Sequence, residues 1–164
     1  MKLLHKLSIS TIFIITFGFC TTINVPADYS TIQEGIDGSS DGDTVLVAAG
    51  TYVENITWPN VPNIQLVSFL GPEQTIIDGS LSGSVIDFGD GQNWGSIHLE
   101  GFTIKNGAAN SGAGLRISFP SSAEHNLTMN KLILENNYGK EGSKGITLTN
   151  KPRNANLYQS KEPD

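Results

Sequence analysis

Short apolar runs separated by polar turns recur along the chain from residue 64 onward. Residues 97–106 align with residues 127–136 at an offset of thirty residues, and apolar positions match apolar positions throughout. Runs this short cannot bury a face alone, but repeated units that stack at strand spacing bury one continuous inward row. The pattern therefore predicts an all-β solenoid in which each unit contributes three short strands.

The alternation also predicts which side chains fill the interior. They are Ile97, Leu99, Phe102, Ile104, Leu115 and Ile117. Phe102 and Leu132 occupy equivalent positions of neighbouring units, so we expect these two side chains to be in contact. A register that is wrong by one residue would turn Phe102 toward water.

Two polar features follow the same thirty-residue register. Asn106 and Asn136 each come directly after a strand, where the chain turns, and asparagine tolerates the left-handed conformation that turns require. We expect them to stack as an asparagine ladder with a structural role. Lys105 and Glu135 should form an opposite-charge pair on adjacent strands.

One short helix is predicted near the N-terminal end of the solenoid. Residues 30–33 have the form of a capping box, with Ser30 as the N-cap and Gln33 three residues later. Ile32 and Ile36 are four residues apart and share one helical face. This helix should cover the first coil, which would otherwise expose apolar interior and an unpaired strand edge.

The first 22 residues have the form of a secretory signal peptide. Lys2 and Lys6 begin the segment, and the apolar run over residues 7–19 is thirteen residues long, too short to cross a bilayer as a helix. The chain is accordingly expected to be secreted, at the cell surface or in the periplasm, with no membrane span after cleavage.

The cleaved bond is open between two positions. Cleavage requires small residues at the third and first positions before the bond, which Gly18 with Cys20, or Cys20 with Thr22, supplies. An uncleaved N-terminal anchor and a lipoprotein with lipid on Cys20 are the alternatives.

The net charge of the chain bears on which partners it can bind. The formal net charge is −6, and removal of Lys2 and Lys6 with the signal peptide takes it to −8. The remaining basic residues are scattered, so nucleic acid is not an expected partner.

The only cysteine is Cys20, so no disulfide stabilises the domain, which we place at residues 23–150. Residues 151–164 are polar and without alternation, typical of a disordered tail.

Residues 29–54 combine an amphipathic turn, a Gly/Asp loop, an apolar strand and the sequence Gly-Thr-Tyr-Val-Glu. This order resembles the N-terminal end of right-handed parallel β-helix proteins of the pectate-lyase-like superfamily, and most closely the opening coils of pectin methylesterases. The resemblance implies a right-handed parallel β-helix of about three to four coils with a short N-terminal capping helix. Gly50, Tyr52 and Glu54 match the family's opening motif, and a structural role for Glu54 is the favoured interpretation.

The chain departs from the esterase family at its catalytic positions. Ser111 stands where the resemblance calls for the glutamine that stabilises the oxyanion, and Ile146 stands where it calls for the general acid. An isoleucine cannot transfer a proton. These two departures favour a chain without esterase activity.

Pectate lyases, which belong to the same superfamily, hold calcium with clustered aspartates and use an arginine as base. Asp87, Asp90 and Arg116 are the corresponding candidates here. Residues 87–91 read as a turn, because Asp-Gly pairs favour turns. Calcium binding is therefore a weak expectation, and the calcium-loop likeness of residues 37–43 lacks the glutamate that closes such a loop.

Exposed aromatic rings can stack on sugars, so the two tryptophans are carbohydrate-binding candidates. Trp58 lies in a strand context and is more consistent with packing, whereas Trp94 lies in a polar loop flanked by glycines and is the better candidate. An acidic polysaccharide or a cell-surface glycan is the expected ligand.

These observations favour a secreted β-helix domain that acts as a non-catalytic scaffold or a carbohydrate-contacting surface module. The rival interpretation is a polysaccharide-active enzyme, either pectinesterase-like or uronate lyase-like, whose catalytic coils are diverged or absent from this chain. The last strands would leave an unpaired edge, so we expect either that the chain is a fragment of a longer β-helix or that it self-associates through the C-terminal coil.

Overall fold

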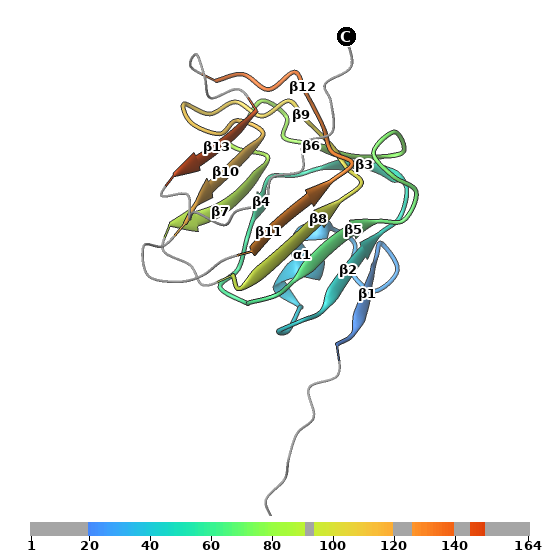
Figure 1. Ribbon diagram of the computed structural model, residues 1–164. Helices are drawn as coiled ribbons and strands as arrows, with labels where there is room; N and C mark the ends of the chain where they lie inside the picture. Colours follow the sequence, from blue (N-terminus) through green and yellow to red (C-terminus); the bar gives the residue numbers. More distant parts are fainter. Residues whose placement is uncertain (1–19, 91–93, 120–125, 140–144, 150–164) are drawn as a thin grey trace, which may run out of the picture.

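The structure is a computed structural model that describes residues 20–90, 94–119, 126–139 and 145–149. Parallel strands make up nearly all of its regular structure, and they form three sheets (Figure 1). The signal-peptide prediction for residues 1–22 falls largely outside the described residues, and the predicted tail at 151–164 falls entirely outside them. Within the described ranges, no helix is long and apolar enough to cross a membrane.

From β2 onward, successive strands of the chain belong to the first, second and third sheet in turn. The first contains β1 (Thr22–Val25), β2 (Thr44–Val47), β5 (Gln65–Ser68), β8 (Ser96–Glu100) and β11 (Asn126–Asn130). The second contains β3 (Gly50–Val53), β6 (Thr75–Asp78), β9 (Thr103–Lys105) and β12 (Ile133–Glu135). The third contains β4 (Ile56–Thr57), β7 (Ile86–Asp90), β10 (Leu115–Ser118) and β13 (Ile146–Thr149).

Each strand from β2 to β10 therefore pairs in parallel with the strand that comes three strands later in the chain. The units β2–β4, β5–β7, β8–β10 and β11–β13 each supply one strand to every sheet, and β1 adds an edge strand to the first sheet. This all-β arrangement of three parallel sheets is consistent with the predicted parallel β-helix. The strand register confirms the thirty-residue repeat, because Ile97 pairs with Leu127 and Lys105 pairs with Glu135.

The core lies between the sheets and is built from the inward positions of the alternation. All six residues predicted to be interior are buried, with Ile97 the most exposed at 3%. Phe102 and Leu132 are also buried, and the Ile133 N–H donates to the Phe102 carbonyl at 3.0 Å, which places the two side chains at equivalent positions of adjacent units. The predicted register is confirmed.

The described residues contain one short helix, α1 (Ile32–Asp37), which packs against β1, β2 and β4 at the N-terminal end of the sheets (Figure 1). Ile32 and Ile36 are fully buried, as predicted. The predicted cap is wrong by one residue: Thr31 is the N-cap, and its capping-box partner is Glu34. Ser30 instead donates its hydroxyl hydrogen to the Glu34 carboxylate at 2.7 Å.

The physical reason for this shift is that Gln33 is bound elsewhere. Its Oε1 accepts the Thr57 N–H at 2.7 Å, and its Nε2 donates to the Thr57 carbonyl at 3.0 Å. The side-chain amide thus pairs with the outer edge of β4 as another strand would. A strand edge that is paired in this way is protected from further association.

The two asparagines adopt the predicted backbone, with φ of 56° at Asn106 and 52° at Asn136. The described side-chain bonds differ from a simple ladder, because Asn106 donates to Asp78 at 2.9 Å. The buried amide at this turn is Asn137, which accepts the Gly107 N–H at 2.9 Å and donates to the Ile104 carbonyl at 3.0 Å. The Lys105 Nζ is 3.9 Å from Asp78 Oδ2. Asp78 belongs to β6, which flanks β9 on one side, whereas Glu135 belongs to β12 on the other side.

Candidate functional site

Glu54, the acid of the opening motif, holds helix α1 in place. It follows β3, and its carboxylate accepts the N–H of Ile32 at 3.0 Å and that of Gln33 at 2.9 Å. The first N–H groups of a helix have no intrahelical acceptor, and a negative charge is favourable at that end. The carboxylate is therefore engaged in a structural contact between the first three-strand unit and the helix.

Gly50 and Tyr52, the other two residues of the motif, lie in β3, just before Glu54. The Tyr52 hydroxyl donates to the Ala48 carbonyl at 3.1 Å, and the ring packs against the core. Burial raises the pKa of Tyr52, and the nearby Glu54 charge raises it further. Gly50 lies next to the same ring, because a Cβ at this position would be 3.4 Å from it, in ordinary van der Waals contact.

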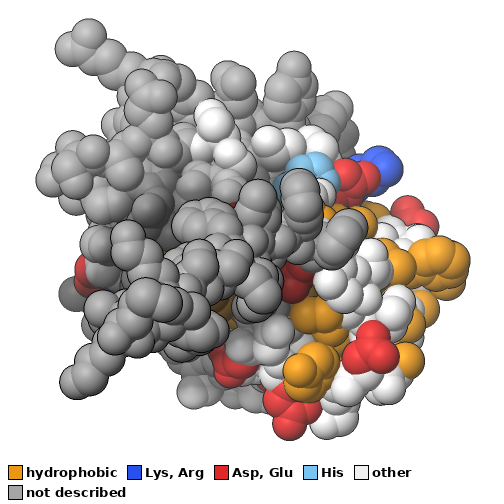
Figure 2. Space-filling model, turned by 90° about the horizontal axis from the view of Figure 1, so that it is seen from below, with side chains coloured by type: hydrophobic (Ala, Val, Ile, Leu, Met, Phe, Trp, Pro, Cys, Tyr) orange, Lys and Arg blue, Asp and Glu red, His pale blue; other side chains and the backbone are white. Residues whose placement is uncertain are grey.

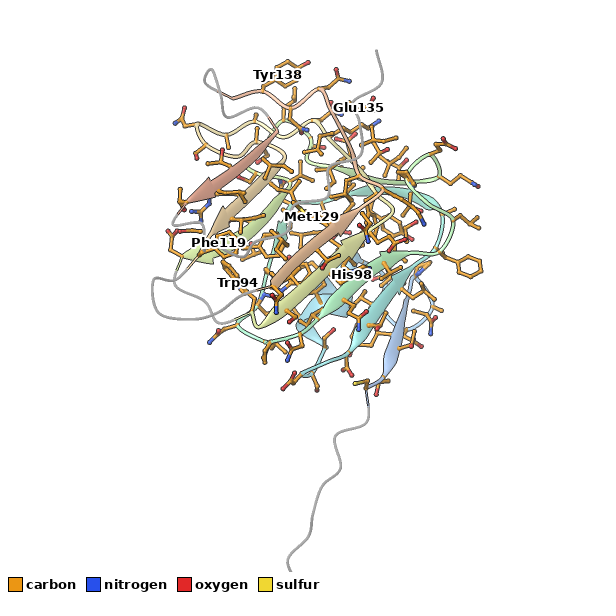
Figure 3. All side chains as sticks on the ribbon, in the orientation of Figure 1. Trp94, His98, Phe119, Met129, Glu135 and Tyr138 are labelled. Carbon is orange, nitrogen blue, oxygen red and sulfur yellow. The ribbon has the colours of Figure 1, made fainter. Side chains whose placement is uncertain are left out.

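Trp94 does not offer a ring to solvent, and its predicted role in stacking on sugars is wrong. The residue is fully buried, and its ring meets Phe88 at 5.7 Å and Phe119 at 5.9 Å in edge-on contacts (Figure 3). Trp58 joins the same row through Phe88 at 4.7 Å, which confirms packing as its role. The polar neighbours of Trp94 in the sequence suggested an exposed loop, but Trp94 lies two residues before β8 and its side chain is part of the core.

Arg116 lies beside both aspartates that were grouped with it in the sequence. In β10, its Nη2 is 2.9 Å from Asp87 Oδ1, and its Nη1 is 3.1 Å from Asp90 Oδ1. Both aspartates belong to the adjacent strand β7, so the turn predicted at residues 87–91 is wrong for the part that is described. Gly89 has φ of 63° and lies at a register shift between β7 and β10, which marks a bulge that brings both carboxylates to one arginine.

The electrostatics of this cluster oppose proton transfer. The hydrogen bond to Asp87 is the main cause that raises the pKa of Arg116, and the charges of both aspartates add to it. The pKa of Asp90 is lowered, first by a hydrogen bond from Ser118 and then by the Arg116 charge. Arg116 and Asp90 are therefore held in their charged forms.

The two positions at which the chain departs from the esterase family lie in different settings. Ser111 is half-buried in the connection between β9 and β10. Ile146 is the first residue of β13 and pairs with Leu115, on the inward side of the third sheet. Ile146 thus contributes to packing against the core.

The carboxylates of the Gly/Asp loop are engaged in hydrogen bonds with protein groups. Asp41 accepts the Asn63 side-chain amide at 2.7 Å, and Asp43 accepts the backbone N–H groups of Thr21 at 2.7 Å and Ser40 at 2.8 Å. Among the described residues, no group of three or more His, Cys, Asp or Glu side chains is placed to hold a metal ion. Calcium binding stays a prediction that these contacts do not favour.

A second charged group lies on the outer face of the first sheet. His98 Nε2 is 3.0 Å from Glu100 Oε2, and Lys131 Nζ is 2.8 Å from Glu100 Oε1. Figure 2 shows the histidine beside an acidic and a basic side chain on the surface. The hydrogen bond from Lys131 is the main cause that lowers the pKa of Glu100, so this carboxylate is charged near neutral pH.

Tyr138 is a surface residue that the sequence analysis missed. Its ring is 58% exposed and lines a shallow depression with Ala108, Ala109, Asn110 and Gly139. Tyr138 is labelled in Figure 3. Its backbone is fixed, because its N–H donates to the Gly107 carbonyl at 2.7 Å and its carbonyl accepts the Ala109 N–H at 3.1 Å. The available signal was its place between Asn137 and Gly139, beyond the last alternating position of the strand.

A scan of protein-family models, a search of curated proteins and a search of solved structures gave no significant match for this chain. Its function is therefore argued from its own residues.

Proposed function

We propose that this chain forms a secreted, right-handed parallel β-helix domain of the pectate-lyase-like type that acts as a non-catalytic scaffold with a carbohydrate-contacting surface. The rotation of strands among three parallel sheets supports the fold. The observation that carries the function is Tyr138, an exposed aromatic ring on a fixed backbone at the edge of a shallow depression. An amphipathic ring of this kind can stack on the apolar face of a sugar.

The chemistry of the depression favours a neutral glycan over an acidic one. Asn110 lines the depression and supplies an amide that can both donate and accept hydrogen bonds with hydroxyl groups. The chain carries a net negative charge that grows when the signal peptide is removed, so a polyanion would be repelled. A neutral cell-surface glycan is therefore the proposed ligand, and an acidic polysaccharide is the alternative that the test must separate.

A glycan array that carries neutral and uronate-containing oligosaccharides tests this proposal on the exported chain. We expect binding to neutral glycans that Tyr138→Ala abolishes. Phe69→Ala is the matched control, because Phe69 is an aromatic residue that is 68% exposed and lies outside the depression. Equal binding by the wild type and Tyr138→Ala, or binding to uronates alone, would contradict the proposal.

The rival function is a uronate lyase or pectinesterase, and one observation favours a lyase. Asp87, Asp90 and Arg116 converge on the outer face of the third sheet, as a lyase-like set would. Two ion pairs and a raised pKa nevertheless make Arg116 a poor base, because a base must be able to lose its proton. An absorbance assay for unsaturated uronate product is expected to show no turnover, and turnover that Arg116→Ala abolishes would support the lyase.

Self-association through the last unit is also part of the proposal. Among the described residues, β11, β12 and β13 each have one strand neighbour, so each presents an open edge. Open parallel edges favour pairing with another chain. Light scattering on the exported chain should give a mass above that of one chain, and a stable monomer would contradict this part.

A further inference from the structure

Thr21 and Asp43 are joined across the start of the first sheet. The Thr21 N–H donates to Asp43 Oδ1 at 2.7 Å, and the Ser40 N–H donates to Oδ2 at 2.8 Å. Asp43 is only 5% exposed. The Thr21 carbonyl also accepts the Thr44 N–H at 2.9 Å, which extends the pairing of β1 with β2 by one residue. The nitrogen of Thr21 is thus aimed at a buried carboxylate.

We propose that the signal peptide is removed between Cys20 and Thr21, and that the new α-ammonium group of Thr21 forms an ion pair with Asp43. This inference rests on the secretion proposed above. Hydrolysis adds one water across the peptide bond, leaves a carboxylate on Cys20 and gives Thr21 a free amine, which is protonated near neutral pH. The distance of 2.7 Å matches a charge-assisted bond from nitrogen to a carboxylate oxygen.

The same contacts discriminate against the other bond that the sequence allows. Cleavage after Thr22 would remove Thr21 entirely, so Asp43 Oδ1 would lose its donor and Thr44 would lose its acceptor. A buried carboxylate oxygen without its partner is unfavourable. Cleavage before Cys20, as in a lipoprotein, would leave Thr21 with an uncharged amide. Cleavage after Cys20 is the one choice that retains both contacts and adds a positive charge facing Asp43.

The first test is the N-terminal sequence of the full-length chain after export from a secreting host. We expect Thr21 as the first residue. An exported chain that begins at Cys20, at Ile23 or at any other residue would overturn this inference and leave the proposed secretion intact. Retention in the cell with Met1 present would overturn both.

The second test measures the ion pair itself. One glycine inserted after Cys20 moves the charged amine away from Asp43 and leaves the rest of the chain unchanged. The inserted glycine should lower the thermal midpoint by about 3 °C or more. It should have no such effect in the Asp43→Asn background, whereas Asp41→Asn, which alters a neighbouring acid, should preserve the effect. An equal fall of the midpoint in the Asp43→Asn background would overturn the ion pair, and N-terminal sequencing of the wild type decides the cleaved bond if that variant fails to fold.

Discussion

At the N-terminal end of the fold, the Glu54 carboxylate accepts two N–H groups that have no acceptor within α1. Replacement by alanine leaves both donors without their charged partner and weakens the contact between the helix and the first unit. We expect Glu54→Ala to lower the free energy of unfolding by about 2 kcal/mol, in the range for hydrogen bonds to a charged group.

Urea denaturation measures this loss, and Glu73→Ala is its control, because Glu73 is an exposed acid in the connection between β5 and β6. A loss for Glu54→Ala no larger than that of the control would mean that the motif acid does not stabilise the fold.

Truncation of Phe102 tests whether this side chain is part of the interior. Its side chain is fully buried beside the equivalent Leu132 of the next unit, so truncation to alanine should cost about 3 to 5 kcal/mol of unfolding free energy. Phe69→Ala removes the same side chain from a site that is 68% exposed and should change stability by about 0.5 kcal/mol or less. Similar losses for the two variants, measured by chemical denaturation, would show that the assigned register is wrong.

At the scale of elements, ion pairs between neighbouring strands make the stability of the sheets depend on pH. Lys131, the residue after β11, donates a hydrogen bond to Glu100 in β8 and lowers the pKa of that carboxyl group. A carboxylate whose pKa is lower in the folded state stabilises the fold above its unfolded pKa of about 4.3. That contribution is lost as the pH falls through the folded pKa.

Lys131→Ala should therefore raise the pKa of Glu100 toward its ordinary value and reduce the stability gained between acid and neutral pH. Side-chain NMR titration follows this carboxylate directly. Asp28 serves as the internal control, because its pKa is lowered by Asn24 and not by Lys131. An unchanged Glu100 titration in the variant would rule out the contact as the cause.

Strands in which apolar and polar residues alternate could be predicted from the sequence. Features that depend on contacts between segments far apart in the sequence could not. The strands around Phe102 follow from a period of two, which tertiary contacts reinforce. The helix cap moved from Ser30 to Thr31 because Gln33 binds the edge of β4, a contact between segments that local rules do not contain. The bulge at Gly89 escaped prediction for a similar reason, since Asp-Gly in sequence favours a turn and the pairing with β10 makes it a strand.

At the scale of the whole molecule, the sequence identified the right residue types for a site but could not say which were already engaged. Arg116 does meet both predicted aspartates, because register places them on adjacent strands. Trp94 is buried although its polar neighbours predicted an exposed ring, and Tyr138, for which the sequence analysis made no prediction, is 58% exposed. The central claim that results is that the residues resembling a catalytic set stabilise the fold.

Methanol release from methylated pectin by the exported chain tests that claim most directly. We predict no release above the blank that contains substrate alone, because Ser111 and Ile146 replace the expected oxyanion donor and acid, and Glu54 is bound to α1. Release that Glu54→Ala abolishes, under conditions where circular dichroism shows that the variant is folded, would contradict the claim and would make Glu54 a catalytic residue.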